Sequence, residues 1–339
     1  MNLGWNIDTD EKRRALLAQV RNVTLSALQQ YTLEWSQIKL NKISDTITFK
    51  INTELDETFL LRIHNNSRSK AEIQSEMMLL QVLGNHGLTV PQGQASRTDE
   101  YVLEMVSEEG ETLYITLMSW LEGELLSDAP SETQAMNTGI LMARLHRAAA
   151  SFVPDANHTF PTWGADSFRK SMAKLEQYYD RFLSDKAWGM YQAAADKIIA
   201  DLEAMEKNES ARNFGLIHAD LHFENVIFRG EEAFPIDFAR SGYGYYLYDI
   251  AGTILGLGGK HRQLFLKGYE SVRKLDEGYM RPLASMFVMF MIENYCHHSS
   301  DPRETAGLIA EQPYAQAIIQ SYLQDRPFLF EPLEPITVE

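Results

Sequence analysis

The sequence predicts an α+β protein with two lobes, a β-rich N-terminal lobe followed by a mainly helical C-terminal lobe. Three observations support this prediction. With 339 residues and 45% hydrophobic content, the chain is long enough for two lobes that each bury a core. Strand-like alternation of apolar and polar residues is concentrated in about the first 120 residues. Helical spacing of apolar residues dominates the rest of the chain.

The N-terminal lobe is expected to begin with a helix and to continue as paired strands. Residues 10–31 carry apolar side chains at helical spacing, and Asp8 or Thr9 is the expected N-cap. Residues 38–63 then alternate between apolar and polar side chains. This alternation predicts a hairpin or a three-stranded meander.

A second helix and two more strands are expected before this lobe ends. Residues 69–83 return to helical spacing, and Gly84 and Gly87 mark the expected stop. Strand-like runs follow at residues 101–106 and 113–118, with an acidic turn between them. The lobe is therefore expected to be rich in strands, with a helix embedded among them.

The C-terminal lobe is expected to be helical apart from one short β interruption. The interruption lies between residues 216 and 236 and contains three short strand-like runs. We expect the N-terminal lobe to cover residues 1–118, a hinge to cover 119–123 and the C-terminal lobe to cover 124–339. Apolar spacing predicts helices at residues 131–149, 167–183, 188–205, 261–272 and 282–295.

Charge and cysteine content exclude several classes of protein. The net charge of −16 argues against a nucleic-acid binder, which needs a basic face, and favours a cationic partner. The single Cys296 excludes an internal disulfide and a multi-cysteine metal site, and it fits a reducing compartment. No apolar run is long enough for a membrane span, and residues 1–6 lack the pattern of a leader peptide. We therefore expect a cytoplasmic protein.

The β interruption contains the residues that indicate chemistry. Residues 217–228 fit the pattern H-x-D-x-x-x-x-N, and Asp237 follows after a turn. In phosphoryl transfer, the Asp of such a loop accepts the proton of the attacking hydroxyl group, which gives Asp220 the role of catalytic base. Magnesium prefers hard oxygen ligands, so Asn225 and Asp237 are the predicted metal ligands.

Each part of this pattern also has a structural interpretation. A lone H-x-D or an isolated Asp-Phe pair is common, and a buried His218 can simply satisfy a backbone group of the core. Their combination, each between β-like runs and followed by residues 242–244 and 248–251, favours the functional interpretation. We assign His218 to holding the loop rather than to catalysis.

With these motifs the chain resembles the aminoglycoside phosphotransferase superfamily, which includes choline kinases, fructosamine kinases and type II homoserine kinases. The resemblance covers most of the chain and implies a protein-kinase-like fold, with ATP, or alternatively GTP, as phosphoryl donor and Mg²⁺ as cofactor. It also implies that Asp249 is a buried anchor of the catalytic loop and that His146 is structural. The residues that carry the resemblance are 60–64, 143–146, 218–225, 236–238 and 248–251.

The resemblance also suggests where the nucleotide phosphates bind. No glycine-rich loop lies between residues 39 and 50, and the corresponding turn offers Ser44 and Thr46. Where a protein kinase has a phosphate-binding Lys, this sequence has Arg62, and Glu76 on the next helix is its expected ion-pair partner. The alternative is that Arg62 and Glu76 are exposed surface charges.

The adenine and the acceptor are assigned by the same resemblance. Backbone groups of Ser119 and Leu121, in the predicted hinge, are expected to contact adenine. The short interval from Asp237 to Asp249 leaves no room for the activation loop of a protein kinase, so the acceptor should be small. The candidate residues of the acceptor pocket are Trp163, Asp166, Tyr243, Tyr245, Glu293 and Tyr295.

Two questions about function stay open at the level of sequence. Aromatic rings and carboxylates suit an ammonium group, which favours a small cationic, amine-bearing alcohol as acceptor. Such an acceptor is either an antibiotic, as with an aminoglycoside in antibiotic resistance, or a metabolite such as homoserine or choline. The alternative class is a catalytically inactive kinase-like module that binds nucleotide. Its motivation is Arg62 and the missing glycine-rich loop, and the presence of Asp220, Asn225 and Asp237 argues against it.

Overall fold

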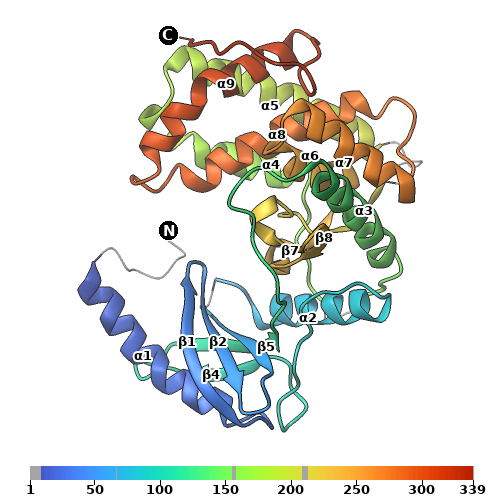
Figure 1. Cartoon of the computed structure of the whole chain (residues 1–339). Helices are drawn as coiled ribbons and strands as arrows, with labels where there is room; N and C mark the ends of the chain where they lie inside the picture. Colours follow the sequence, from blue (N-terminus) through green and yellow to red (C-terminus); the bar gives the residue numbers. More distant parts are fainter. Residues whose placement is uncertain (1–8, 66, 155–157, 208–212, 339) are drawn as a thin grey trace. The chain divides into compact units, whose positions relative to one another are not determined.

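The computed structural model of this chain divides into two compact units, and Figure 1 labels most of their helices and strands. The first unit contains Met1–Glu122 and Phe152–Phe160, and the second contains Gly123–Ser151 and Pro161–Glu339. No sequence pattern indicated that residues 152–160 belong with the first unit. The predicted hinge at residues 119–123 stays a prediction. The structure describes residues 9–65, 67–154, 158–207 and 213–338.

The first unit is built on an antiparallel sheet whose strand order is β1-β2-β3-β5-β4. The predicted three-stranded meander is therefore confirmed, and the first two helices lie where the sequence indicated. Thr9 is the N-cap of the first helix, while Asp8 lies outside the described residues. The elements are α1 (Asp10–Leu28), β1 (Trp35–Ile43), β2 (Thr46–Thr53), β3 (Thr58–His64), α2 (Lys70–Asn85), β4 (Leu103–Val106) and β5 (Thr112–Ser119).

Alternation and capping explain why these elements form. In β2 the apolar residues Ile47, Phe49 and Ile51 are buried, as expected for a strand with one face in the core. Helix α2 begins with a capping box in which Ser69 Oγ accepts a hydrogen bond from the Glu72 N–H, and the Glu72 carboxylate accepts one from the Ser69 N–H. This cap sets where α2 starts and so fixes which of its residues face β3.

The second unit is mainly helical, as predicted, with two short antiparallel ribbons, β6 with β9 and β7 with β8. Within the described residues, no helix combines the length and apolar character that crossing a membrane requires. The elements are α3 (Glu132–Ala149), α4 (Ala165–Leu175), α5 (Asp185–Glu206), β6 (Phe214–Ile217), β7 (Val226–Arg229), β8 (Glu232–Pro235), β9 (Gly242–Tyr245), α6 (Tyr246–Leu255), α7 (Gly259–Val272), α8 (Met280–His298) and α9 (Thr305–Leu323).

The helix predicted at residues 167–183 is wrong in its second half. Helix α4 ends at Leu175, and the chain tightens into a 3₁₀ turn at Tyr179–Arg181. The turn brings Phe182 into the core and stacks the Tyr179 ring on Trp188, with ring centroids 4.8 Å apart. Tertiary packing therefore overrides the local helical spacing.

Three elements were not predicted individually, namely α6, β9 and α9. Pro313 lies inside α9 and removes one N–H donor, which is why the sequence of this helix does not look continuous. Strand β9 is only four residues long and contains two glycines, so its strand signal is weak. Strand β9 and helix α9 depend on partners that are distant in sequence. Strand β9 pairs with β6, and α9 packs against α5 and α8.

Helices α3 and α7 pack with their backbones in direct contact. A Cβ atom at Gly139 would lie 2.0 Å from the Phe265 carbonyl oxygen, and one at Gly268 would lie 2.1 Å from the Met136 carbonyl oxygen. Any side chain at either position would push the two helices apart. This close approach lets His146 of α3 meet Tyr269 of α7 below the catalytic loop.

Candidate active site

The loop between β6 and β7 brings the predicted catalytic residues together. The N–H of His222 donates to the Asp220 carbonyl oxygen at 2.9 Å. The side-chain nitrogen of Asn225 donates to the same carbonyl oxygen at 2.9 Å and to Asp220 Oδ2 at 3.3 Å. The loop is thus closed on itself, and the Asp220 side chain keeps 24% of its surface exposed. Asp220 is therefore positioned by its neighbours while it stays accessible to a ligand.

Two hydrogen bonds join this loop to the end of β8. The Ile236 N–H donates to the Asn225 carbonyl oxygen at 2.9 Å, and His218 Nε2 lies 3.0 Å from the Ile236 carbonyl oxygen. Asp237, the next residue, is exposed and has a left-handed backbone with φ 60°. The structure therefore holds Asn225 next to the segment that carries Asp237. The contact of His218 with Ile236 is the loop-holding role predicted for it.

The donor set at this place fits a magnesium ion. Because the amide nitrogen of Asn225 is used by Asp220, its amide oxygen is the atom left for a cation. Asp237 adds an exposed carboxylate, and both are the hard oxygen ligands that Mg²⁺ prefers. Across the described residues, no group of three or more His, Cys, Asp or Glu residues forms a metal site by itself. Mg²⁺ usually takes only one or two protein ligands, together with phosphate oxygens and water.

The buried carboxylate of Asp249, in α6, binds the backbone of the catalytic loop. It accepts hydrogen bonds from the His218 N–H at 2.8 Å and from the Ala219 N–H at 2.6 Å. Its third partner is His146 Nε2 at 2.9 Å, and His146 Nδ1 lies 2.9 Å from the Tyr269 hydroxyl group. Ala219 has a positive φ of 63°, so the hydrogen bonds of Asp249 stabilise a backbone conformation that an L residue rarely adopts.

The protonation states of Asp249 and His146 follow from these contacts. Burial alone raises the pKa of the Asp249 carboxyl, but the hydrogen bonds from His146 and from the His218 N–H outweigh burial and bring that pKa below its usual value. Burial lowers the pKa of His146, and the Asp249 carboxylate only partly opposes this. The pair is therefore a neutral imidazole that donates to a carboxylate, which is the structural role expected for both residues.

Replacing Asp249 by Asn is expected to lower the free energy of unfolding by about 2–4 kcal/mol, because an amide cannot accept from two backbone N–H groups and His146 together. The kcat should fall as well, since the loop that carries Asp220 loses its anchor. Urea denaturation and steady-state kinetics measure the two effects. Tyr269→Phe is the matched control, because it removes only the far end of the same chain and should cost about 1 kcal/mol. An Asp249→Asn protein as stable as the Tyr269→Phe protein would contradict this role.

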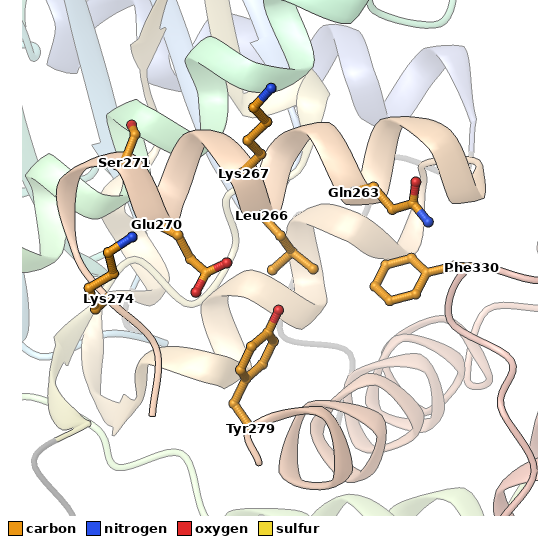
Figure 2. Close-up of a pocket in the computed structure, with 8 residues that line it drawn as sticks. All are labelled: Gln263, Leu266, Lys267, Glu270, Ser271, Lys274, Tyr279 and Phe330. Atoms are coloured by element: carbon orange, nitrogen blue, oxygen red, sulfur yellow. The ribbon is translucent and has the colours of Figure 1, made fainter. Parts of the chain in front are cut away.

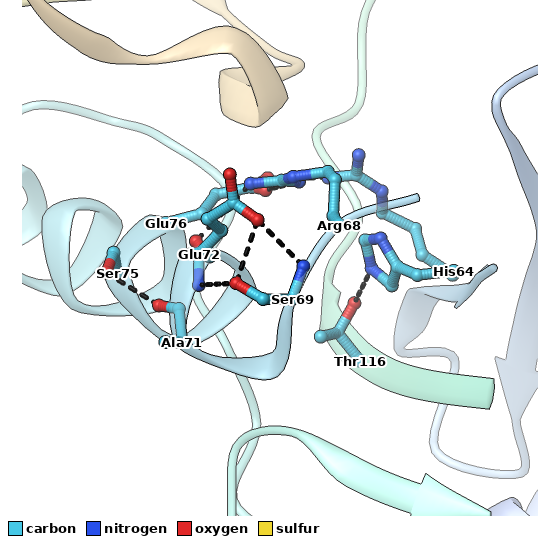
Figure 3. Close-up of polar contacts among 9 residues, drawn as sticks. His64, Arg68, Ser69, Ala71, Glu72, Ser75, Glu76 and Thr116 are labelled. Atoms are coloured by element: carbon cyan, nitrogen blue, oxygen red, sulfur yellow. Dashed lines mark hydrogen bonds and ion pairs between the residues drawn. The ribbon is translucent and has the colours of Figure 1, made fainter. Parts of the chain in front are cut away.

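In the first unit, Arg62 and Glu76 form the predicted ion pair, and a second arginine shares it. Arg62 Nη1 lies 2.6 Å from Glu76 Oε1, and Arg68 Nη1 lies 2.6 Å from Glu76 Oε2. Figure 3 shows Arg68 directed at the carboxylate of Glu76 on α2. Arg62 and Glu76 are buried, so the alternative of exposed surface charges is wrong. Sequence reasoning missed Arg68, whose only signal was its position just before the start of α2.

The charges of this cluster are unequal. Two guanidinium groups face one carboxylate, so the Arg62, Arg68 and Glu76 cluster keeps a net positive charge. Burial by itself raises the pKa of Glu76, but Arg62 and Arg68 outweigh it and lower that pKa to about 2. Nearby, His64 contacts Thr116 Oγ1 at 3.2 Å (Figure 3), and burial and the arginines lower the pKa of His64 well below its usual value.

The other residues predicted to contact nucleotide lie at strand ends of the first unit. Ser44 is exposed in the turn between β1 and β2, and its N–H donates to the Thr46 carbonyl oxygen at 3.0 Å. The Ser119 N–H donates to the Gln92 carbonyl oxygen at 2.9 Å, so that N–H is not available to adenine. The nucleotide contacts assigned to Ser44, Thr46, Ser119 and Leu121 stay predictions.

Two of the predicted acceptor residues belong to a packed column of side chains in the second unit. The rings of Trp163 and Tyr248 are stacked with centroids 6.0 Å apart and an interplanar angle of 13°. The Tyr248 hydroxyl group donates to Glu293 Oε2 at 2.5 Å, and Ser171 donates to Glu293 Oε1 at 3.3 Å. Burial raises the pKa of Glu293, although Tyr248, the charge of Arg240 and Ser171 oppose the shift. Sequence reasoning included Trp163 and Glu293 but missed Arg240.

The remaining acceptor candidates have varied surroundings. Asp166 is exposed and pairs with Arg169 at 2.8 Å. Tyr245 and Tyr295 are buried in the hydrophobic core of the unit. The backbone of Tyr243 joins Trp163 to β9, because the Trp163 N–H donates to the Tyr243 carbonyl oxygen at 2.7 Å. Their acceptor contacts stay predictions.

The second unit also has an open cavity of about 400 Å³ that is lined by residues of α7 together with Tyr279 and Phe330 (Figure 2). Leu266, Glu270 and Tyr279 are among its lining residues, and Figure 2 shows the side chains of Glu270 and Tyr279 facing each other. None of the predicted catalytic, metal or acceptor residues lines this cavity.

Comparisons with protein families and known proteins show what the chain is similar to. A model of the phosphotransferase enzyme family (APH) matches residues 38–283. An uncharacterised protein of Synechocystis sp. is 28% identical over 228 residues, which are 65% of this chain and 62% of that protein. A homoserine kinase of Beijerinckia indica is 26% identical over 231 residues, which are 64% of this chain and 65% of that kinase. The chain therefore matches less than two thirds of the length of these curated relatives.

Solved structures with the same fold include two kinases of small molecules. A microcompartment-associated aminopropanol kinase has a TM-score of 0.77 at 19% identity, covering 90% of this chain and 98% of its own. The amicoumacin kinase hAmiN, in complex with AMP-PNP, Ca²⁺ and Ami, has a TM-score of 0.76 at 18% identity, covering 94% of this chain and 97% of its own. At these identities the similarity shows the fold, and the predicted kinase-like fold is confirmed.

Proposed function

The chain belongs to the phosphotransferase enzyme family, and from this premise we propose that it transfers the γ-phosphoryl group of ATP to a hydroxyl group of a small, amine-bearing acceptor. The observation that carries the proposal is the loop in which Asp220, Asn225 and the segment of Asp237 are joined by hydrogen bonds. An inactive relative would have no need to hold Asp220 and Asn225 beside the segment that carries Asp237.

The proposed reaction is a single displacement at phosphorus. The acceptor oxygen forms a bond to the γ-phosphorus, the bond from that phosphorus to the β–γ bridging oxygen breaks, and ADP leaves. Asp220 accepts the proton of the hydroxyl group, so the products are a phosphate monoester, ADP and a proton. Asn225 and Asp237 would hold Mg²⁺, which neutralises phosphate charge when it is bound. Arg62 and Arg68 provide the positive charge proposed to face the nucleotide phosphates.

Three observations support an amine-bearing acceptor. The chain has a net charge of −16, which attracts cations over long range. Relatives and structural neighbours include kinases named for homoserine, aminopropanol and amicoumacin. The column of Trp163, Tyr248 and Glu293 offers aromatic and acidic groups in the same unit as Asp220. The single, buried Cys296 fits action in the reducing cytoplasm.

A panel of hydroxylated amines tests the proposal. The panel contains amino alcohols, hydroxy amino acids, choline, aminoglycosides and other amino-hydroxy antibiotics, each incubated with ATP or GTP and Mg²⁺. The expected result is a mass gain of one phosphoryl group on at least one acceptor, with formation of ADP or GDP. A protein that binds ATP but phosphorylates no member would instead support the inactive, nucleotide-binding alternative.

Magnesium is expected to be required for tight nucleotide binding. Calorimetry should give an ATP affinity at least about 10-fold higher with Mg²⁺ than with EDTA, because the unshielded phosphate charge would otherwise face Asp237 and Asp220. In Asp237→Asn this difference should shrink, since a neutral amide is a poorer ligand. Equal ATP affinities with and without Mg²⁺ in the unmodified protein would count against Asn225 and Asp237 as ligands.

A further inference from the structure

The second unit places a cation beside the proposed catalytic base. Arg240 Nη1 lies 3.7 Å from Asp220 Oδ1, and 35% of the arginine side chain is exposed. Arg240 ends the 3₁₀ turn Phe238–Arg240, which directly follows the proposed metal ligand Asp237. A guanidinium at this position is next to the place where the hydroxyl group of an acceptor must bind.

The guanidinium of Arg240 is held in place by the column of side chains beneath it. Its central carbon lies 4.7 Å from the centre of the Trp163 ring, and the Trp163 Nε1–H donates to the Arg240 carbonyl oxygen at 3.1 Å. Trp163 stacks on Tyr248, which in turn donates to the buried carboxylate of Glu293. The column therefore fixes both the backbone and the charged end of Arg240, which long surface side chains rarely achieve.

We propose that Arg240 binds a carboxylate of the acceptor, so that the acceptor is a small hydroxy acid that also carries an amine. This inference rests on the proposed function and specifies its substrate class. A guanidinium presents several N–H donors in a rigid plane that matches the two oxygens of a carboxylate. Beside its contact with Asp220, the Arg240 side chain keeps enough exposed surface for a ligand to reach it.

The geometry also limits the size of the acceptor. An acceptor hydroxyl group would lie about 2.7 Å from Asp220, and a carboxylate would lie about 2.8 Å from Arg240. Since the two protein groups are 3.7 Å apart, the hydroxyl oxygen and the carboxylate oxygen can be separated by at most about 9 Å. A spacer of two or three carbon atoms stays well within this limit, as in an α-amino acid with a hydroxyl group on its side chain.

Electrostatics explains why a carboxylate needs a dedicated partner here. The chain as a whole is negative, and Asp220, Asp237 and Glu293 lie in the same unit. An anionic acceptor would be repelled unless a local cation compensated, and Arg240 provides that charge at the proposed base. The amine of the same acceptor would be attracted by the surrounding negative field. A zwitterionic acceptor therefore suits both signs of charge.

Matched pairs of acceptors that differ only by the carboxylate test this inference. L-Homoserine is compared with 3-aminopropan-1-ol, and L-serine with ethanolamine. The unmodified protein should prefer the acid of at least one pair by about 10–100-fold in kcat/KM, the range expected for a hydrogen-bonded charge pair. Arg240→Met should raise the KM for that acid by a similar factor and raise the KM for its partner alcohol by a much smaller factor. Arg240→Lys should fall between the two, because it keeps the charge but loses the planar donor set.

Arg303→Met is the control for a lost surface charge, since Arg303 is exposed and pairs with Asp301 near α9. Equal losses for acid and alcohol in Arg240→Met would mean that Arg240 acts on Asp220 or on the phosphoryl group, and would overturn the inference. An unmodified protein that uses the alcohols as well as the acids would also overturn it, while leaving the kinase proposal intact.

Calorimetry separates this inference from the proposed function. The two acids and the two alcohols are titrated into the protein with Mg²⁺ and AMP-PNP present, where no phosphoryl transfer is needed. Binding of an acid that Arg240→Met weakens supports the carboxylate site even if no acceptor is phosphorylated. Absence of binding of both acids, or acid binding that the substitution leaves unchanged, overturns it.

Discussion

Replacing Asp220 by Asn is expected to lower kcat by about 10²–10⁴-fold, the usual contribution of a general base, while KM values change little. The amide has the same size as the carboxylate and can still accept the hydrogen bond from Asn225, so the loop should keep its shape. What it loses is the ability to take the proton of the acceptor hydroxyl group. Single-turnover and steady-state kinetics with the best acceptor of the panel measure the effect.

The stability of the Asp220→Asn protein decides how a loss of activity is interpreted. Asp220 is partly exposed and lies beside Arg240, so its neutralisation should change the free energy of unfolding by about 1 kcal/mol or less. Asp196→Asn, on the exposed face of α5, controls for the loss of one negative charge. A kcat within about 10-fold of the unmodified protein would remove Asp220 from the role of base.

The parts of the fold and the site that sequence predicted are those encoded by local patterns. The meander formed by β1, β2 and β3 follows from alternation, and the start of α2 follows from Ser69 and Glu72. The spacing of His218, Asp220 and Asn225 lies within one short loop, so its convergence could be expected before the structure was known.

The parts that sequence missed depend on contacts between distant segments. Arg240 reaches its position through Trp163, which is 77 residues earlier in the chain. Arg68 looks like an ordinary cation before a helix, and only the burial of Glu76 reveals that it completes an ion cluster. The link from Tyr269 through His146 spans 123 residues. None of these contacts has a periodic signature, so a single sequence does not predict them.

The Glu76→Gln substitution is expected to lower the free energy of unfolding by about 3–5 kcal/mol at neutral pH, because it leaves the buried Arg62 without a counter-charge. Glu72→Gln, one turn earlier on α2, is the matched control. Glutamine can replace glutamate in a capping box, so that variant should lose only a few tenths of a kcal/mol. Removing the arginine as well, in the Arg62→Met and Glu76→Gln double variant, should recover part of the lost stability. Equal stabilities of the two single variants would contradict the buried ion cluster.

The pH dependence of stability distinguishes the contribution of the Glu76 charge from the contribution of its packing. The arginines lower the pKa of folded Glu76 from 4.5 to about 2, so the stability due to its charge is fully present above about pH 4.5. That contribution is lost as the pH falls from about 4.5 to about 2, because the unfolded chain takes up the proton first. The difference in unfolding free energy between the unmodified protein and Glu76→Gln should therefore shrink by about 1 kcal/mol between pH 7 and pH 3.5. Urea denaturation at both pH values measures it, and a constant difference would mean that Glu76 acts through shape and not through charge.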